Sequence, residues 1–164
     1  MASTVAIVFE GGLKGEVNDS PIRAGVLLYK GAAQAGRVAI LVDRTSQEKV
    51  EYWLNLQNMH DHSWIILPRA SDPLDPAQRR LLQVARLRSE GSAVELVLEP
   101  NPAVAAALQG SGVATALFMH PATARPEYRP DFEGKNRPWA LVEAEIDRQL
   151  LMTDSEPETL TRIV

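Results

Sequence analysis

The feature that most constrains how this chain folds is the apolar run at residues 4–13, which reads TVAIVFEGGL. β-Branched residues are frequent in the run and no polar residue alternates within it, which predicts a central strand covered on both faces. Gly11 and Gly12 then allow the backbone to turn sharply at the carboxyl end of the strand. Ligands bind at this end of the strands in open α/β sheets. We therefore expect Glu10 at the floor of any functional site.

Four further apolar runs alternate with segments of helical periodicity. The runs cover residues 37–42, 64–67, 93–98 and 113–118. A helix is expected at residues 21–35, with Ser20 as its N-cap. A second helix is expected after Thr45, because Thr45 and Glu48 have the spacing of a capping box. Two more are expected at residues 76–89 and between Pro102 and Gln109. This alternation predicts an α/β domain over residues 1–119, built on a mainly parallel five-stranded sheet with right-handed crossovers.

The chain departs from this alternation after residue 119. Residues 120–138 contain four prolines, which predicts an extended strap, and an amphipathic helix of the same domain is expected from there to residue 152. Residues 153–164 are acidic and are expected to fray. The strap and helix combine aromatic residues with arginines, which predicts an interaction surface for a protein partner or a second copy of this chain. Its residues are Arg125, Tyr128, Arg129, Phe132, Arg137 and Trp139. A structural tether across the sheet edge is an equal alternative for the strap.

Composition excludes several classes of site. The 164 residues carry a formal net charge of -4, which gives no reason to expect a nucleic-acid partner. They include no cysteine, which excludes disulfides and thiolate sites. No apolar run approaches the roughly 20 residues of a membrane span, and the first residues lack the basic start of a signal peptide. We expect a soluble, cytoplasmic protein with no membrane partner and no cofactor.

Three segments carry a resemblance to a known family. They are FEGGL after the first strand, VDRT after the second, and LVLEPNPAVAAALQGSGVATALF at residues 96–118. Together they resemble the haloacid dehalogenase (HAD) superfamily. More narrowly, they are similar to small capless members such as the phosphatase halves of polynucleotide kinases and HAD-like proteins of actinobacterial phages. The resemblance implies a three-layer, Rossmann-like fold with the strand order 5-4-1-2-3.

The same resemblance implies that this chain lacks catalytic residues of the family. It puts Val8 where the family has its aspartate nucleophile and Glu10 where it has the acid–base aspartate. Valine has no nucleophilic atom, so an aspartyl-phosphate cannot form there. Val42 replaces the phosphate-binding Thr or Ser, although Asp43 follows it. We expect Val8 and Val42 to be buried.

The family's metal and phosphate positions are kept only in part. Glu99 fills one of the two acidic positions that bind Mg²⁺, and an alanine fills the other. Arg69, or Arg79 and Arg80 on the next helix, are candidates for the basic residue that neutralises phosphate. Glu10 and Glu99 could still meet at the sheet edge and bind Mg²⁺, which prefers oxygen ligands.

Structural roles compete with these interpretations. Glu10 and Glu99 could be solvated or hydrogen-bonded acids at strand ends rather than a site. His60, Asp61 and His62 are explained better by a polar turn than by a metal site. The arginines of the 76–89 helix are more typical of a solvated face than of a phosphate patch. They are Arg79, Arg80, Arg86 and Arg88.

Two functions are therefore consistent with the sequence. The first, which the missing nucleophile favours, is a catalytically inert HAD-like domain that acts as a protein-interaction or assembly component. In that case Glu10, Asp43, Arg69 and Glu99 are vestiges of a lost site. The second is a divergent Mg²⁺-dependent phosphohydrolase, acting on nucleotides or polynucleotide 3′-phosphates through Glu10, Glu99 and a metal-activated water. The resemblance to phage proteins leaves a phage origin and a place in the virion open.

Overall fold

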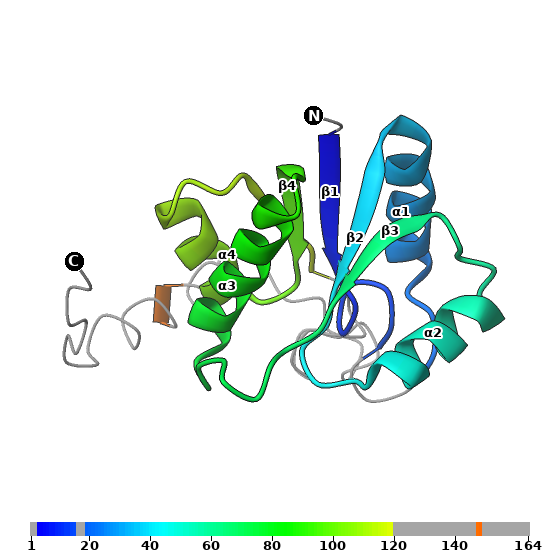
Figure 1. The fold of residues 1–164 in the computed structure, drawn as a ribbon, viewed down its shortest axis with the longest axis horizontal. Coiled ribbons are helices and arrows are strands. Elements are labelled where there is room, and N and C mark those ends of the chain that lie inside the picture. Colours follow the sequence, from blue (N-terminus) through cyan, green and yellow to red (C-terminus); the bar gives the residue numbers. More distant parts are fainter. Residues whose placement is uncertain (1–2, 16–18, 120–146, 149–164) are drawn as a thin grey trace, which may run out of the picture.

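The computed structural model of this chain describes residues 3–15, 19–119 and 147–148. Strands and helices alternate along residues 3–117 of this described part (Figure 1). The strands are β1 (Ser3–Val8), β2 (Arg37–Leu41), β3 (His62–Ile66), β4 (Ala93–Glu99) and β5 (Thr115–Leu117). The helices are α1 (Arg23–Ala35), α2 (Gln47–Leu56), α3 (Pro76–Ser89) and α4 (Pro102–Gly110).

All neighbouring strands of the sheet are parallel, in the order β3-β2-β1-β4-β5. This is the expected order 5-4-1-2-3 read from the opposite edge. β1 lies at the centre, as its uninterrupted apolar run predicted. Val8 and Val42 are each 0% exposed, so their predicted burial is confirmed. The prediction of an α/β fold with a five-stranded parallel sheet is also confirmed.

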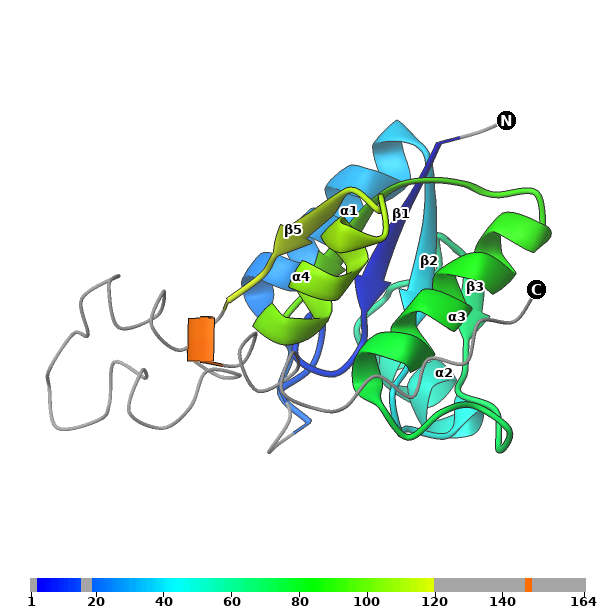
Figure 2. The same cartoon turned by 90° about the vertical axis from the view of Figure 1, so that its left-hand side faces the viewer.

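Helices cover both faces of the sheet and form three layers. Figure 1 shows α1 and α2 on one side of the strands and α3 and α4 on the other, and Figure 2 shows α3 and α4 in front. One apolar cluster joins the sheet to Tyr29 of α1 and Trp53 of α2. A second cluster joins the opposite face to Val84 of α3 and Leu108 of α4. The architecture is therefore Rossmann-like.

The strand order has a switch point between β1 and β4. From β1 the chain proceeds outward through β2 to β3 on one side, and then crosses to β4 and β5 on the other side of β1. The connections that leave the carboxyl ends of β1 and β4 therefore diverge to opposite faces. This divergence creates the position where open α/β sheets bind ligands.

The first helix begins later than the sequence predicted. Its expected N-cap was Ser20, but α1 starts at Arg23 and Ile22 occupies the N-cap position without a side-chain hydrogen bond. The reason is that the preceding residues pair with the loop after β1. Pro21 forms an antiparallel bridge with Lys14, and the Ile22 N–H donates to the Leu13 carbonyl oxygen at 2.8 Å.

The fifth strand is shorter than predicted. It covers Thr115–Leu117 rather than residues 113–118, because Val113 belongs to the turn that ends α4. The Val113 N–H donates to the Leu108 carbonyl oxygen at 2.9 Å, and Gly112 adopts a positive φ of 75°.

The predicted strap, the helix that follows it and the predicted frayed tail lie outside the described residues, except for residues 147–148. No helix of the described part is long and apolar enough to cross a membrane.

Two glycines allow the loop after β1 to pack closely against α1. A Cβ on Gly25 would lie 1.8 Å from the Gly12 carbonyl oxygen, and a Cβ on Gly12 would lie 2.1 Å from that of Val8. Such contacts would force the backbone to move. These glycines therefore set how closely α1 approaches the carboxyl end of β1.

We predict that Gly25→Ala lowers the free energy of unfolding by about 1–3 kcal/mol, because the added methyl group meets backbone atoms. Gly31→Ala in the same helix is the matched control, since a Cβ there meets nothing within 4 Å. It should raise the free energy by about 0.5–1 kcal/mol, because alanine favours helix interiors. Urea denaturation measures both values. Equal effects of the two substitutions would contradict the close packing at Gly25.

Candidate functional site at the carboxyl edge of the sheet

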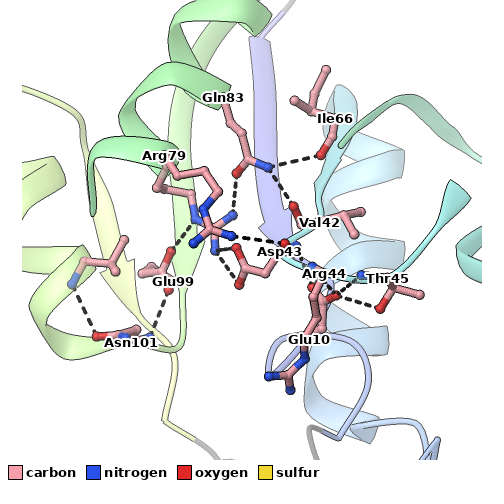
Figure 3. Close-up of polar contacts among 12 residues, drawn as sticks. Glu10, Val42, Asp43, Arg44, Thr45, Ile66, Arg79, Gln83, Glu99 and Asn101 are labelled. Carbon is pink, nitrogen blue, oxygen red and sulfur yellow. Dashed lines mark hydrogen bonds and ion pairs between the residues drawn. The ribbon is translucent and has the colours of Figure 1, made fainter. Parts of the chain in front are cut away.

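Acidic side chains follow three adjacent strands at the carboxyl edge of the sheet. Glu10 follows β1, Asp43 follows β2, and Glu99 is the last residue of β4. Because β2, β1 and β4 are neighbours, these side chains gather at the switch point (Figure 3). From α3, Arg80 reaches Asp43 and Glu99, and Gln83 bonds to Arg80. We call these five residues the edge network.

The carboxylate of Glu10 holds the loop that leaves β2. Its Oε2 accepts a hydrogen bond from the Asp43 N–H at 2.9 Å. Its Oε1 accepts from the N–H groups of Arg44 at 3.1 Å and Thr45 at 3.0 Å, and from the Thr45 hydroxyl at 2.7 Å. Glu10 is only 2% exposed. Both of its oxygens are therefore occupied by the protein itself.

These hydrogen bonds decide the protonation state of Glu10. Burial raises the pKa of its carboxyl, but the hydrogen bonds from Asp43, Thr45 and Arg44 outweigh burial and hold the pKa below its ordinary value. Glu10 is therefore a carboxylate at neutral pH. The expected capping box at Thr45 does not form, because Thr45 bonds to Glu10 and Ser46 takes the N-cap position of α2 without a side-chain hydrogen bond.

The guanidinium of Arg80 lies between two carboxylates. Its Nε is 2.8 Å from Glu99 Oε2, and its Nη2 is 2.8 Å from Asp43 Oδ1. Its Nη1 donates to Gln83 Oε1 at 2.6 Å. Burial lowers the pKa of Arg80, but the Glu99 and Asp43 carboxylates outweigh burial and raise it. Arg80 is thus a permanent cation with all three nitrogens bonded, at an exposure of 3%.

The burial of Arg80 corrects the expectation that the α3 arginines form a solvated face. That expectation was wrong for Arg80, although Arg88 is exposed. Arg80 shares the spacing i, i+3, i+4, i+7 with Gln83, Val84 and Leu87, all of them buried. This helical spacing was the available signal, and the polar character of Arg80 and Gln83 concealed it.

Gln83 and Glu99 extend the network across the sheet. Gln83 Nε2 donates to the Val42 carbonyl oxygen at 2.7 Å and to that of Ile66 at 3.3 Å, where β2 and β3 end. Glu99 is 1% exposed, and its Oε1 accepts from the Asn101 N–H at 2.9 Å. Burial raises the pKa of Glu99, while the adjacent Arg80 charge favours its ionised form. We infer an ionised Arg80–Glu99 pair at neutral pH, because the permanent charge of Arg80 lies 2.8 Å from Glu99 Oε2 and the Asn101 N–H donates to the same carboxylate.

Arg79 and Arg86 of α3 both contact the loop between β3 and α3. Arg79 donates to the carbonyl oxygens of Asp43 at 3.3 Å and Leu74 at 2.9 Å, while its Nε is buried without a partner. Arg86 forms an ion pair with Asp72. Arg69, a candidate for phosphate neutralisation, has an exposed side chain, and its N–H donates to Asp72 at 2.7 Å. The edge network therefore contains Arg80 but does not contain Arg69.

The donor set at the edge does not fit a Mg²⁺ ion. The oxygens of Glu10 bond to the loop after β2, whereas those of Glu99 bond to Arg80 and Asn101. No group of three or more His, Cys, Asp or Glu side chains that could hold a metal is found within residues 3–15, 19–119 and 147–148. In place of a metal, the guanidinium of Arg80 supplies the positive charge beside Asp43 and Glu99.

The histidines before β3 are part of a turn and a strand end. His62 begins β3, and its Nδ1 lies 3.5 Å from the Tyr29 hydroxyl. Burial lowers the pKa of His62, so the ring favours its neutral form. His62 belongs to the strand, and the predicted turn is confined to His60 and Asp61. The predicted interaction surface of Arg125, Tyr128, Arg129, Phe132, Arg137 and Trp139 lies outside the described residues.

Comparison with known proteins finds no family model that matches this chain, and no significantly similar curated protein or solved structure. The resemblance to the HAD superfamily therefore stays a prediction.

We predict that Arg80→Met lowers the free energy of unfolding by about 3–5 kcal/mol, because it leaves the Glu99 charge buried and unpaired. The double variant Arg80→Met/Glu99→Met should recover much of this loss, since apolar groups then replace the buried pair. Arg88→Met is the control on the exposed side of α3, with an effect within about 0.5 kcal/mol. Urea denaturation compares them. A loss in Arg80→Met no larger than in Arg88→Met would contradict the role of the ion pairs.

A second prediction concerns acid stability. The pKa of Glu10 is lower in the folded protein than its ordinary value of 4.5, so Glu10 stabilises the fold above that pH. This contribution is lost as the pH falls through the folded pKa. Wild type should be more stable than Glu10→Gln at pH 7, and the difference should shrink below pH 4.5. Denaturation across this range tests it, with the exposed Glu90→Gln as control. A stability difference between wild type and Glu10→Gln that grows as the pH falls would contradict this prediction.

Proposed function

We propose that this chain is a catalytically inert, HAD-like domain that works by binding another protein, as an interaction or assembly component. The observation that carries the proposal is that the charged groups at the carboxyl edge are already bonded to one another or to the backbone. Arg80, 3% exposed, pairs with Asp43 and Glu99 at the position where sheets of this kind bind ligands. Charges that are already paired and buried offer little to a phosphate, a metal ion or a cofactor.

The residues at the end of β1 support the same proposal. Val8, at the position that the resemblance assigns to the nucleophile, is 0% exposed and has no nucleophilic atom. Glu10, at the acid–base position, has both oxygens bonded to residues 43–45. A carboxylate whose pKa is held low by such hydrogen bonds is a poor proton donor near pH 7.

The HAD-like part of the proposal rests on the three resembling segments and on the strand order, which is the order that the resemblance implies. A phage origin and a place in the virion rest on the resemblance alone. The partner surface around Tyr128 and Trp139 rests on the sequence, because it lies outside the described residues.

A divergent Mg²⁺-dependent phosphohydrolase is the second candidate, and one observation favours it. The Asp43 side chain is 39% exposed, so an ion from solvent could reach its carboxylate. For this function Asp43 and Glu99 would have to release Arg80, and Glu10 would have to release the loop after β2. The cost of leaving Arg80 buried without partners disfavours this rearrangement.

An assay separates the two functions. We predict that wild type with Mg²⁺ hydrolyses p-nitrophenyl phosphate and a 3′-phosphorylated oligonucleotide no faster than Asp43→Asn, because no nucleophile or metal site is available. Asp43→Asn is the informative variant, since Asp43 is partly exposed. Circular dichroism checks that the variant is folded. Mg²⁺-dependent turnover that disappears in folded Asp43→Asn would overturn the proposed function and support the phosphohydrolase.

A further inference from the structure

β3 is an edge strand whose outer side is unpaired in the described part of the chain. It pairs with β2, and no other strand of residues 3–15, 19–119 or 147–148 lies beside it. β5, at the opposite edge, has three residues, whereas β3 has five. The β3 sequence HSWII contains no proline, lysine or carboxylate, the residues with which natural edge strands prevent pairing. This edge is therefore open to the addition of a strand.

The side chains of β3 are incompletely covered. Ile40 and Leu41 of the neighbouring β2 are 0% exposed, whereas Trp64, Ile65 and Ile66 of β3 are only partly buried. Trp64 and Ile66 pack towards the face covered by α3 and α4, and Ile65 packs towards the opposite face. A further strand beside β3 would bury apolar surface on both faces of the sheet, which stabilises an association.

The backbone determines which residues of β3 a new strand could pair with. The Val42 N–H donates to the Ile66 carbonyl oxygen at 3.0 Å, so Ile66 faces β2. Because hydrogen-bonding groups alternate along a strand, the groups of Ile65 and Leu67 point away from β2. The register shift of the β2–β3 ladder precedes Trp64, so residues 64–66 form its regular part. The Leu67 carbonyl oxygen accepts from Arg86 Nη1 at 3.2 Å and keeps a second lone pair.

The charges at the two ends of β3 are suited to a second copy of the same strand running antiparallel. Asp61 precedes β3 and Arg69 lies beyond its end, and both residues are exposed. An antiparallel pair centred on Ile65 puts the end of β3 that carries Asp61 beside the end of the second copy that carries Arg69. Both residues flank the strand, so their side chains meet beyond its ends. A parallel pair in register would instead place like charges together. Charge complementarity thus favours the antiparallel arrangement.

We propose that two copies of this chain associate through β3, antiparallel, across a two-fold axis at Ile65. The inference rests on the proposed function as an interaction domain and names its partner. The two Ile65 residues exchange both backbone hydrogen bonds, and an Asp61–Arg69 ion pair at each end fixes the register. Two five-stranded sheets become one continuous sheet. Because the strand is short and the contact small, we expect a dissociation constant of about 10–100 µM.

Charge-reversal variants test the register in which the two copies of β3 pair. Sedimentation equilibrium of the full chain from about 1 µM to 1 mM should show a monomer–dimer equilibrium. Asp61→Arg and Arg69→Asp should each weaken the dimer about tenfold, because like charges then meet at both ends. The double variant Asp61→Arg/Arg69→Asp should restore the wild-type dissociation constant. Glu90→Arg makes the same change from a negative to a positive charge as Asp61→Arg, at an exposed residue after α3. It should leave the dissociation constant of the dimer unchanged.

Amide hydrogen exchange followed by NMR tests the strand itself. The Ile65 N–H should become protected as the protein concentration rises, because it then bonds to the second copy. The Ile66 N–H faces β2 and should be protected at every concentration. Protection of Ile65 that does not depend on concentration would mean that another segment covers β3, and this would overturn the proposal.

Two further results would also overturn the dimer. One is a wild-type chain that stays monomeric at about 1 mM. The other is a dimer that the single charge variants leave unchanged, since its contact would then lie elsewhere. Neither result bears on catalysis, so the proposed inert function would still be decided by the phosphatase assay. Conversely, Mg²⁺-dependent turnover would overturn that function without altering the β3 measurements.

Discussion

The buried charge of Arg80 is the constraint on which the carboxyl edge of this sheet depends. A guanidinium removed from water destabilises the fold by several kcal/mol, roughly, unless carboxylates and other acceptors surround it closely. These acceptors are Asp43 at the end of β2, Gln83 in α3 and Glu99 in β4. Arg80 therefore fixes α3 relative to strands on both sides of β1. The positions of these elements cannot change without breaking an ion pair in a medium of low polarity.

Glu10 complements Arg80 by joining the end of β1 to the loop that leaves β2. The two charged groups have opposite sign, and each is satisfied by its own set of partners. As a result, the switch point contains many ionisable atoms but few that are accessible for chemistry. In a catalytic site, by contrast, charged groups are held so that a substrate or a transition state completes their interactions. At this edge the protein has already completed them.

Most of the fold could be predicted from the sequence, because apolar runs and helical spacing report directly on burial. The centre of the sheet followed from the run before Glu10, and the parallel direction of the strands followed from the alternation of strands and helices. The order of the strands was an expectation from the resemblance. Arg80 was missed because an arginine is usually exposed, and only its spacing with Gln83, Val84 and Leu87 indicated burial. The start of α1 was missed because the bridge between Pro21 and Lys14 is a tertiary contact, which local capping signals do not include.

The edge network is difficult to explain by stability alone. Well-packed apolar residues are often as stabilising as a buried ion pair, or more so, and they need no exact set of partners. What a network of charges adds is specificity, since an alternative packing of α3 would leave Arg80 or Glu99 unpaired. The network therefore provides a rigid scaffold at the switch point, in which each charged group is bonded to other parts of the protein. The outer side of β3, at one edge of the sheet, has no partner strand in the described part of the chain. The interaction that we propose for this edge is therefore compatible with a centre of the sheet whose charges are already bonded within the protein.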